Sequence, residues 1–203
     1  MIPVQKKPEP DNFDVDVRKP GLAYIHANPN TPASKLPAYW RKVLRYAWEQ
    51  YGGICAYLAV YIDFPTGGVS IDHFVPKSKD KSLVYEWDNY RLSSLGANRD
   101  KGSYENILDP FTIKADTFIL NLLDGDIQPN STLSEEQKQQ CKYTIKCLGL
   151  DDPCVNQMRC NHITEYLRGN VSADYLKQTS PFVYAELLRQ GFIDENKGKG
   201  VWE

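Results

Sequence analysis

The clearest strand-like patterns of this sequence lie close together, and helix-like patterns stand on both sides of them. Residues 54–64 are rich in Tyr, Val and Ile, residues 69–74 alternate apolar and polar side chains, and residues 85–94 resume the β pattern. The Pro-Thr-Gly-Gly turn at 65–68 separates the first two segments. Strands grouped in the chain and flanked by helices are typical of an α+β fold, which we therefore expect.

A helix is predicted directly before this β region, over residues 38–51. Apolar side chains recur there at spacings of three and four, and Gly52 and Gly53 end the pattern. Trp40 and Trp48 belong to the apolar face of this helix. We interpret them as core residues rather than as a platform on which nucleic-acid bases stack.

From residue 103 onward the pattern becomes helical. Residues 115–123 fit either a helix or an amphipathic strand. Ser134 and Gln137 form the sequence signature of a capping box, which predicts a helix that ends at Gly149. Two further helix starts are predicted at Asp152-Pro153 and at Ser172, the last helix breaking before Pro181 and then resuming.

Prolines are concentrated at the beginning of the chain. Seven of the 13 prolines fall within residues 1–38, which predicts an extended arm with few regular elements that lies over the surface. We accordingly divide the chain into this arm, a core with its preceding helix over residues 39–110, and a helical region over residues 111–203 that packs on the core.

Neither a membrane anchor nor a secretory signal is visible in the sequence. No stretch of 18 apolar residues occurs, and the first residues lack an apolar run. We therefore expect a cytoplasmic protein without a membrane partner. The five cysteines are an odd number, which favours reduced thiols over disulfides. Those of the C-terminal half are interpreted as buried thiols of a helical core.

Three polar pieces follow one another over residues 72–101: Asp72-His73, Trp87-Asp88-Asn89-Tyr90-Arg91 and Asn98-x-x-Lys101. Their chemistry suits phosphodiester hydrolysis, which needs a base for the attacking water and a cation near the phosphate. An imidazole such as that of His73 titrates near neutral pH. The carboxylate of Asp72 and the amide oxygen of Asn98 are hard ligands that suit Mg²⁺ or Mn²⁺.

In this order the three pieces resemble the HNH endonucleases, also called His-Me finger or ββα-metal nucleases, in their His-Asn-Asn variant. A wider run, including Cys55-Ala56-Tyr57 and Asp72-His73-Phe74-Val75-Pro76-Lys77-Ser78, is similar to uncharacterised bacterial HNH proteins. The resemblance implies a ββα-metal (His-Me) finger over about residues 54–103, embedded in a mostly helical domain.

The resemblance also implies a role for each piece. Asp72 and Asn98 would hold one divalent ion, Mg²⁺ or Mn²⁺, and His73 would be the general base. Asn89 would hold the His73 ring or its loop in place without touching the substrate. The candidate phosphate contacts are Lys77, Arg91 and Lys101.

Asp72 and His73 are consecutive, and consecutive side chains of a regular strand point to opposite faces. For both to reach one site, we expect a bulge or a local twist where the strand ends. Each residue type also has a plainer interpretation. Asp72-His73 could be a turn with a satisfied histidine, Asn98 could be a helix N-cap, and Lys77 could belong to a solvated loop.

Many HNH relatives also carry a structural zinc ion held by two Cys-x-x-Cys pairs. In this chain Cys55 is the only thiol at the corresponding positions, and a tetrahedral Cys₄ site needs four. We therefore expect no structural zinc, with packing of Leu58, Leu95 and Ala97 in its place.

Charge is distributed unevenly along the chain. Residues 1–101 carry 14 Lys and Arg against 11 Asp and Glu, whereas residues 102–203 carry 10 against 15. The resemblance implies an endonuclease that acts on nucleic acid, DNA more than RNA, and the mild positive excess of the first half predicts weak and salt-sensitive affinity. The acidic C-terminal half would suit a protein partner. The alternative is a nucleic-acid-binding or scaffold protein that keeps the HNH fold without cleaving.

Overall fold

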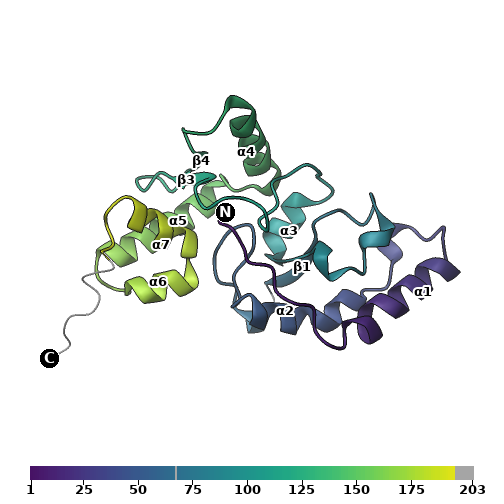
Figure 1. Ribbon diagram of the computed structural model, residues 1–203. Coiled ribbons are helices and arrows are strands. Elements are labelled where there is room, and N and C mark those ends of the chain that lie inside the picture. Colours follow the sequence, from purple (N-terminus) through teal and green to yellow (C-terminus); the bar gives the residue numbers. More distant parts are fainter. Residues whose placement is uncertain (67, 195–203) are drawn as a thin grey trace.

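The computed structural model describes residues 1–66 and 68–194, in which helices dominate and two small antiparallel sheets occur (Figure 1). The expected α+β architecture is thus confirmed. The α-helices are α1 (Lys19–Ala27), α2 (Leu44–Gln50), α3 (Leu95–Lys101), α4 (Glu135–Leu148), α5 (Pro153–Leu167), α6 (Ala173–Thr179) and α7 (Pro181–Arg189). The strands are β1 (Val69–His73), β2 (Tyr90–Ser94), β3 (Phe118–Leu120) and β4 (Ile127–Pro129). Short 3₁₀ turns occur at Ala33–Lys35, Tyr39–Val43, Phe64–Thr66, Lys81–Leu83 and Trp87–Asn89, and a π-helical turn at Asp14–Arg18.

The β1–β2 hairpin and α3 follow one another directly and form the centre of the N-terminal half. The two strands pair without interruption from Val69 opposite Ser94 to His73 opposite Tyr90. The Ser94 hydroxyl then caps α3 by accepting a hydrogen bond from the Ala97 N–H. Both α2 and α3 contact both strands, and Figure 1 shows β1 between the two helices.

The prolines of the N-terminal segment had predicted an extended arm on the surface, and this prediction is wrong. Residues 14–27 are helical, and the side chains of Met1, Phe13 and Val17 are fully buried. Phe13 and Val17 are four residues apart and therefore share one helical face, which packs into the core. Three of the prolines precede the helical stretch and three follow it, while Pro20 lies in the first turn of α1, where a proline is well tolerated.

The β-rich composition of residues 54–64 does not produce a strand. Only one isolated bridge forms there, between Ile54 and Tyr61. Ala59, at a φ of 52°, turns the chain back, and its N–H donates to the Cys55 carbonyl. The apolar residues of this segment are buried instead in a compact turn, as Tyr57 is.

The C-terminal helices begin and end where the sequence predicts. Ser134 and Gln137 form both hydrogen bonds of the capping box of α4, and Gly149 ends that helix in the left-handed conformation. Asp152 caps α5, and Ser172 caps α6. The ambiguous residues 115–123 contain a strand, β3. Cys141 and Cys147 are buried as expected, but Cys154 is exposed and Cys160 is half-buried.

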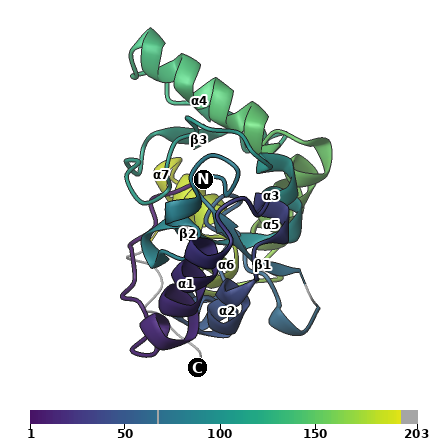
Figure 2. The ribbon, with the colours of Figure 1, turned by 90° about the vertical axis from the view of Figure 1, so that its right-hand side faces the viewer.

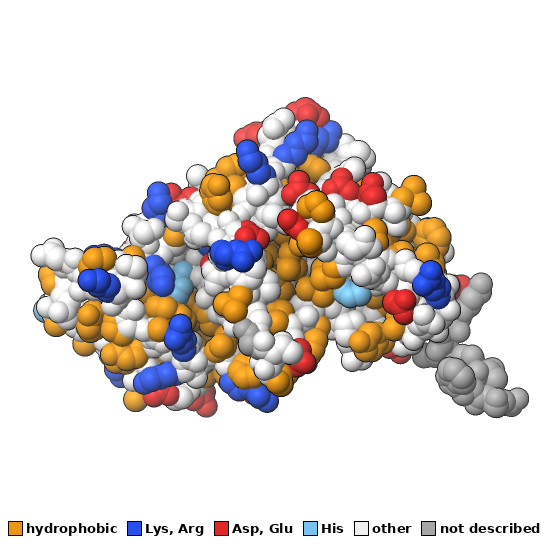
Figure 3. Space-filling view, turned by 180° about the vertical axis from the view of Figure 1, so that it is seen from behind, with side chains coloured by type: hydrophobic (Ala, Val, Ile, Leu, Met, Phe, Trp, Pro, Cys, Tyr) orange, Lys and Arg blue, Asp and Glu red, His pale blue; other side chains and the backbone are white. Residues whose placement is uncertain are grey.

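The two halves of the molecule occupy different regions. Helices α5, α6 and α7 lie at one end and α1 at the other, with α2 between them below β1 (Figure 1), while α4 projects from the top of the molecule (Figure 2). In Figure 3, Lys and Arg side chains are scattered over the left part of the face, and a group of Asp and Glu side chains lies at the upper right. Among the described residues, no helix combines the length and apolarity that crossing a bilayer demands.

Candidate active site

A cleft of about 720 Å³ brings together residues that are far apart in the sequence. Asp72 and His73 at the end of β1 line it, as does Asn98 on α3. Trp40 and Arg41, from the segment before α2, line the same cleft. The remaining lining residues are Ala33, Ser34, Leu44, Val69, Ser70, Ile71, Pro76, Lys77, Ser78, Leu95, Gly102 and Ser103.

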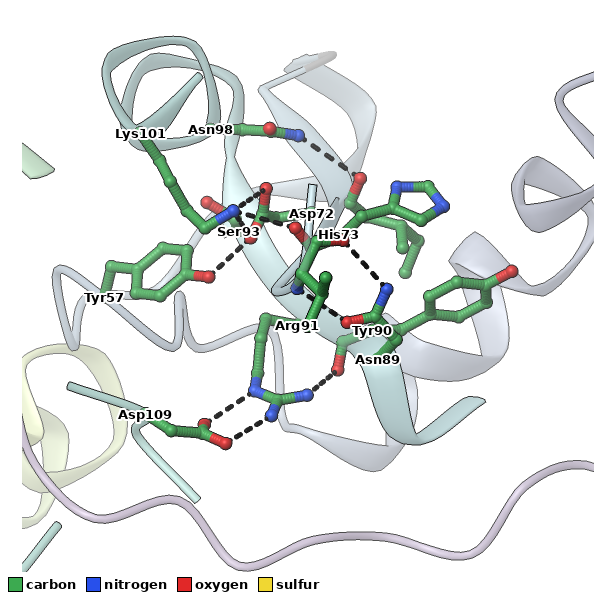
Figure 4. Close-up of polar contacts among 12 residues, drawn as sticks. Tyr57, Asp72, His73, Asn89, Tyr90, Arg91, Ser93, Asn98, Lys101 and Asp109 are labelled. Atoms are coloured by element: carbon green, nitrogen blue, oxygen red, sulfur yellow. Dashed lines mark hydrogen bonds and ion pairs between the residues drawn. The ribbon is translucent and has the colours of Figure 1, made fainter. Parts of the chain in front are cut away.

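The Asp72 carboxylate is buried and held by two donors (Figure 4). The Tyr57 hydroxyl donates to Oδ2 at 2.5 Å, and Lys101 Nζ lies 3.2 Å from Oδ1 and 3.1 Å from Oδ2. Burial raises the pKa of the Asp72 carboxyl, while the Lys101 ammonium and the Tyr57 hydroxyl act in the opposite direction. A charged carboxylate at this depth is tolerated because both donors compensate it.

Tyr57 is a site residue to which the sequence analysis gave no role. Its position depends on Cys55, whose Sγ accepts hydrogen bonds from the Leu58 N–H and the Ser94 N–H, both at 3.4 Å. The thiol thereby joins the turn over residues 55–58 to the end of β2. Burial beside Asp72 raises the pKa of Tyr57 well above its ordinary value, so the hydroxyl remains protonated and donates.

The His73 imidazole is also buried, and its tautomer follows from its hydrogen bond. Nε2 lies 2.9 Å from the Val84 carbonyl, which can only accept, so Nε2 carries the proton and Nδ1 is left as an acceptor. Trp40 and Tyr90 contact the ring edge-on, with centroid distances of 4.7 and 5.2 Å. Burial lowers the pKa of His73 to about 3, so the ring is neutral at ordinary pH.

The bulge expected at the end of β1 does not form. Asp72 pairs with Arg91 and His73 with Tyr90 in regular register. Figure 4 accordingly shows the Asp72 carboxylate on the side of Lys101 and the imidazole on the other side of the strand. Both residues nevertheless line the cleft, whose wall includes all five residues of β1.

Asn89 holds the segments on either side of the histidine. Its Oδ1 accepts a hydrogen bond from the Val75 N–H at 2.7 Å, and its Nδ2 donates to the carbonyls of Val75 and Leu83, both at 3.1 Å. Asn89 is buried, and the residues that line the cleft do not include it. The described contacts therefore give it a positioning role at the loop that carries the Val84 carbonyl.

Asn98 lies inside α3, which Ser94 caps, so its interpretation as the N-cap is wrong. Its Nδ2 donates to Ser70 Oγ at 3.1 Å and to the Ile71 carbonyl at 3.2 Å. These bonds tie α3 to β1 and orient the amide, with Oδ1 as its acceptor. Asn98 is half-buried at the cleft wall.

Two of the three predicted phosphate contacts require correction. Arg91 is 3% exposed, and its guanidinium forms a bidentate pair with Asp109 at 2.9 and 2.6 Å. It also stacks on the Phe111 ring at 3.6 Å. Lys101 is fully buried against Asp72. Neither cation is available to a phosphate in this arrangement, because each is already neutralised by a carboxylate.

Lys77, the third predicted phosphate contact, does line the cleft. It is half-buried, and its ammonium lies 4.4 Å from the centre of the Trp40 ring. Burial and the nearby Arg41 lower the pKa of Lys77. Arg41 is exposed and lines the same cleft. The sequence analysis gave Arg41 no role, because it considered only the apolar face of the predicted helix over residues 38–51. Trp40 and Trp48 are only half-buried, and Trp40 forms part of the cleft wall.

The packing expected in place of a zinc ion is only partly present. Ala97 is buried and Leu58 is half-buried, but Leu95 is 54% exposed at the cleft. Hydrogen bonds to the Cys55 thiol, described above, join the two turns instead.

The donor atoms of the cleft fit a hard divalent cation in kind, since Asp72 offers carboxylate oxygens and Asn98 an amide oxygen. Two protein ligands are few, so solvent and substrate oxygens would complete the shell. Within residues 1–66 and 68–194, no three His, Cys, Asp or Glu side chains form a group suited to a metal ion. The chain matches no protein-family model, and a search among curated proteins found no match.

Proposed function

We propose that the protein is a metal-dependent endonuclease of the HNH type, which hydrolyses phosphodiester bonds of nucleic acid, DNA in preference to RNA. The observation that carries the proposal is the shared cleft of His73, Asp72 and Asn98. It combines a neutral imidazole that has an acceptor nitrogen with two kinds of oxygen ligand, one from β1 and one from α3.

The proposed role of His73 is that of general base. Its Nδ1 would accept the proton of the attacking water, while the Val84 carbonyl holds Nε2–H and fixes the tautomer. The edge-on contacts of Trp40 and Tyr90 limit rotation of the ring. Asn89 would keep the Val84 carbonyl in place for this hydrogen bond, because its side chain joins Val75 to Leu83, the residue before Val84.

The other residues of the cleft would bind the substrate. Asp72 and Asn98 would hold one Mg²⁺ or Mn²⁺, which supplies positive charge next to the scissile phosphate and its leaving oxygen. Arg41 and Lys77 are the cations at the cleft, and they would contact neighbouring phosphates of the strand. With only these two cations at the cleft, we expect weak binding that added salt weakens further.

We further propose that this activity belongs in the cytoplasm, because an odd number of cysteines, five, favours reduced thiols and a reducing compartment. The acidic C-terminal half, with 15 Asp and Glu against 10 Lys and Arg over residues 102–203, is unsuited to nucleic acid. It is more suitable as a surface for a protein partner.

A second candidate function is that of a nucleic-acid-binding or scaffold protein that does not cleave. The observation that favours it is the ion pair of Asp72 with Lys101, in which the carboxylate already has a cation. In a scaffold this pair would be permanent and would serve stability alone.

Cleavage of supercoiled plasmid and of matched single-stranded DNA and RNA, with Mg²⁺, Mn²⁺ or EDTA, separates the two candidates. We expect metal-dependent nicking that His73→Ala abolishes. The matched control is His26→Ala, which removes an exposed imidazole on α1, away from the cleft. Equal residual cutting by both variants would identify a contaminating nuclease and support the non-cleaving candidate.

A further inference from the structure

Lys101 occupies the place next to Asp72 where a cation would bind. Its Nζ is within 3.2 Å of both carboxylate oxygens and 2.8 Å from the His73 carbonyl. The Lys101 side chain is 0% exposed and the Asp72 side chain 3% exposed. Figure 4 shows the ammonium directed at the carboxylate from α3. The three contacts use an ammonium's donors fully.

The carboxylate in turn has little capacity left for a further ligand. Oδ2 accepts from both Tyr57 and Lys101, so Oδ1 is the oxygen with remaining acceptor capacity. A divalent ion on Oδ1 would stand next to the buried ammonium, and like charges repel strongly where water is excluded. Simultaneous binding of both cations is therefore unfavourable.

We propose that Lys101 is a built-in competitor for the divalent ion, so that Asp72 accepts the ion only when the ammonium withdraws from the carboxylate. This inference rests on the proposed function, since it assumes that Asp72 is a metal ligand. Lys101 is the last residue of α3, and Gly102 and Ser103, which follow it, line the cleft. The released ammonium therefore has a short route to the cleft, where a substrate phosphate would neutralise it.

The prediction concerns metal affinity without substrate. Mn²⁺ binding to the full chain is measured by calorimetry for the parent, Lys101→Met, Asp72→Asn and the double variant. We expect Lys101→Met to bind Mn²⁺ at least tenfold more tightly than the parent. The gain should vanish in the double variant, because Asp72 would be the ligand that was freed.

Tyr57→Phe is the matched control. It removes the other buried donor to Asp72 but leaves the charge of Lys101 in place. If Tyr57→Phe gained as much Mn²⁺ affinity as Lys101→Met, the inference would be overturned. Removal of any hydrogen-bond donor to Asp72 would then be enough to tighten Mn²⁺ binding, and the charge of Lys101 would have no special role. A folded Lys101→Met protein that binds Mn²⁺ no more tightly than a binding-competent parent would overturn it as well.

Lys101→Met leaves the buried Asp72 carboxylate without a cation or a donor from position 101 and can fail to fold. Lys101→Gln serves as a second variant, because its amide is uncharged but can still donate a hydrogen bond. Circular dichroism with and without Mn²⁺ shows which variants are folded. A Lys101 variant that folds only with Mn²⁺ supports the inference, whereas a folded Lys101→Gln without tighter binding overturns it. Failure of the proposed function is distinct: Asp72→Asn would then leave any Mn²⁺ binding unchanged in both backgrounds, and the parent would cut no substrate.

Discussion

The Asn89 carboxamide holds the backbone of Val75 at two points: Oδ1 accepts from the Val75 N–H at 2.7 Å, and Nδ2 donates to the Val75 carbonyl at 3.1 Å. The same Nδ2 donates to the carbonyl of Leu83, the residue before Val84, which holds the imidazole of His73. Asn89 therefore connects the chain after β1 to the loop that orients the candidate base.

Asn89→Asp should destabilise the protein by about 2–3 kcal/mol, since the carboxylate loses both N–H donors and faces two carbonyl oxygens. Urea denaturation measures this free energy of unfolding. Asn161→Asp, at an exposed position on α5, should change it by less than about 0.5 kcal/mol. Equal effects of the two substitutions would contradict a positioning role.

The Asp72–Lys101 pair should show strong coupling in a double-mutant cycle. Lys101→Met or Asp72→Asn alone leaves one buried charge without its partner, which should cost about 3–5 kcal/mol in unfolding free energy. The double variant leaves neither charge and should be close to the parent in stability. Thermal or urea unfolding in EDTA measures the cycle, and additive losses in the double variant would argue against a coupled buried pair.

Arg91 should behave as a structural residue and not as a phosphate contact. Arg91→Ala removes the bidentate ion pair that the buried guanidinium forms with Asp109. This loss should lower the free energy of unfolding by about 3–5 kcal/mol. Under conditions where the variant is folded, the salt dependence of its DNA binding should match that of the parent. A slope of log affinity against log salt that is smaller by about 1 would restore the phosphate role.

The buried His73 predicts a defined pH dependence of stability. The unfolded imidazole takes up a proton below pH 6.5, whereas the folded one remains neutral until its pKa of about 3. Its contribution is therefore fully present above pH 6.5 and is lost as the pH falls toward 3, by about 5 kcal/mol at most. In EDTA, His73→Gln should lose less unfolding free energy than the parent between pH 7 and pH 4. Parallel pH profiles for the two proteins would show that His73 titrates normally.

Lys77 and Arg41 should carry much of the electrostatic affinity for nucleic acid. Each replacement by Ala should weaken binding similarly for all sequences and reduce the salt slope by about 1. Fluorescence anisotropy with a labelled oligonucleotide over a salt series measures this. Lys146→Ala, which removes an exposed cation on α4, is the control expected to leave the slope unchanged.

Local patterns were sufficient to locate most helices. The capping box of Ser134 and Gln137, the glycine at 149 and the proline at 153 act within a few residues of themselves, so their effect is legible in the sequence. The same holds for the two hairpin strands and for the short helix that follows them. Residues 54–64 were mispredicted, because β-rich composition records a preference for burial more than a strand.

The sequence by itself determined which polar groups occur near the hairpin and in what order. Only the tertiary structure decided which of them meet: Tyr57 reaches Asp72 from a turn 15 residues away, and Arg91 pairs with Asp109 from a segment 18 residues further on. Whether a lysine is a surface cation or a buried counter-ion depends on the carboxylate that packing places beside it. Such pairings join residues distant in sequence, and no local propensity specifies them.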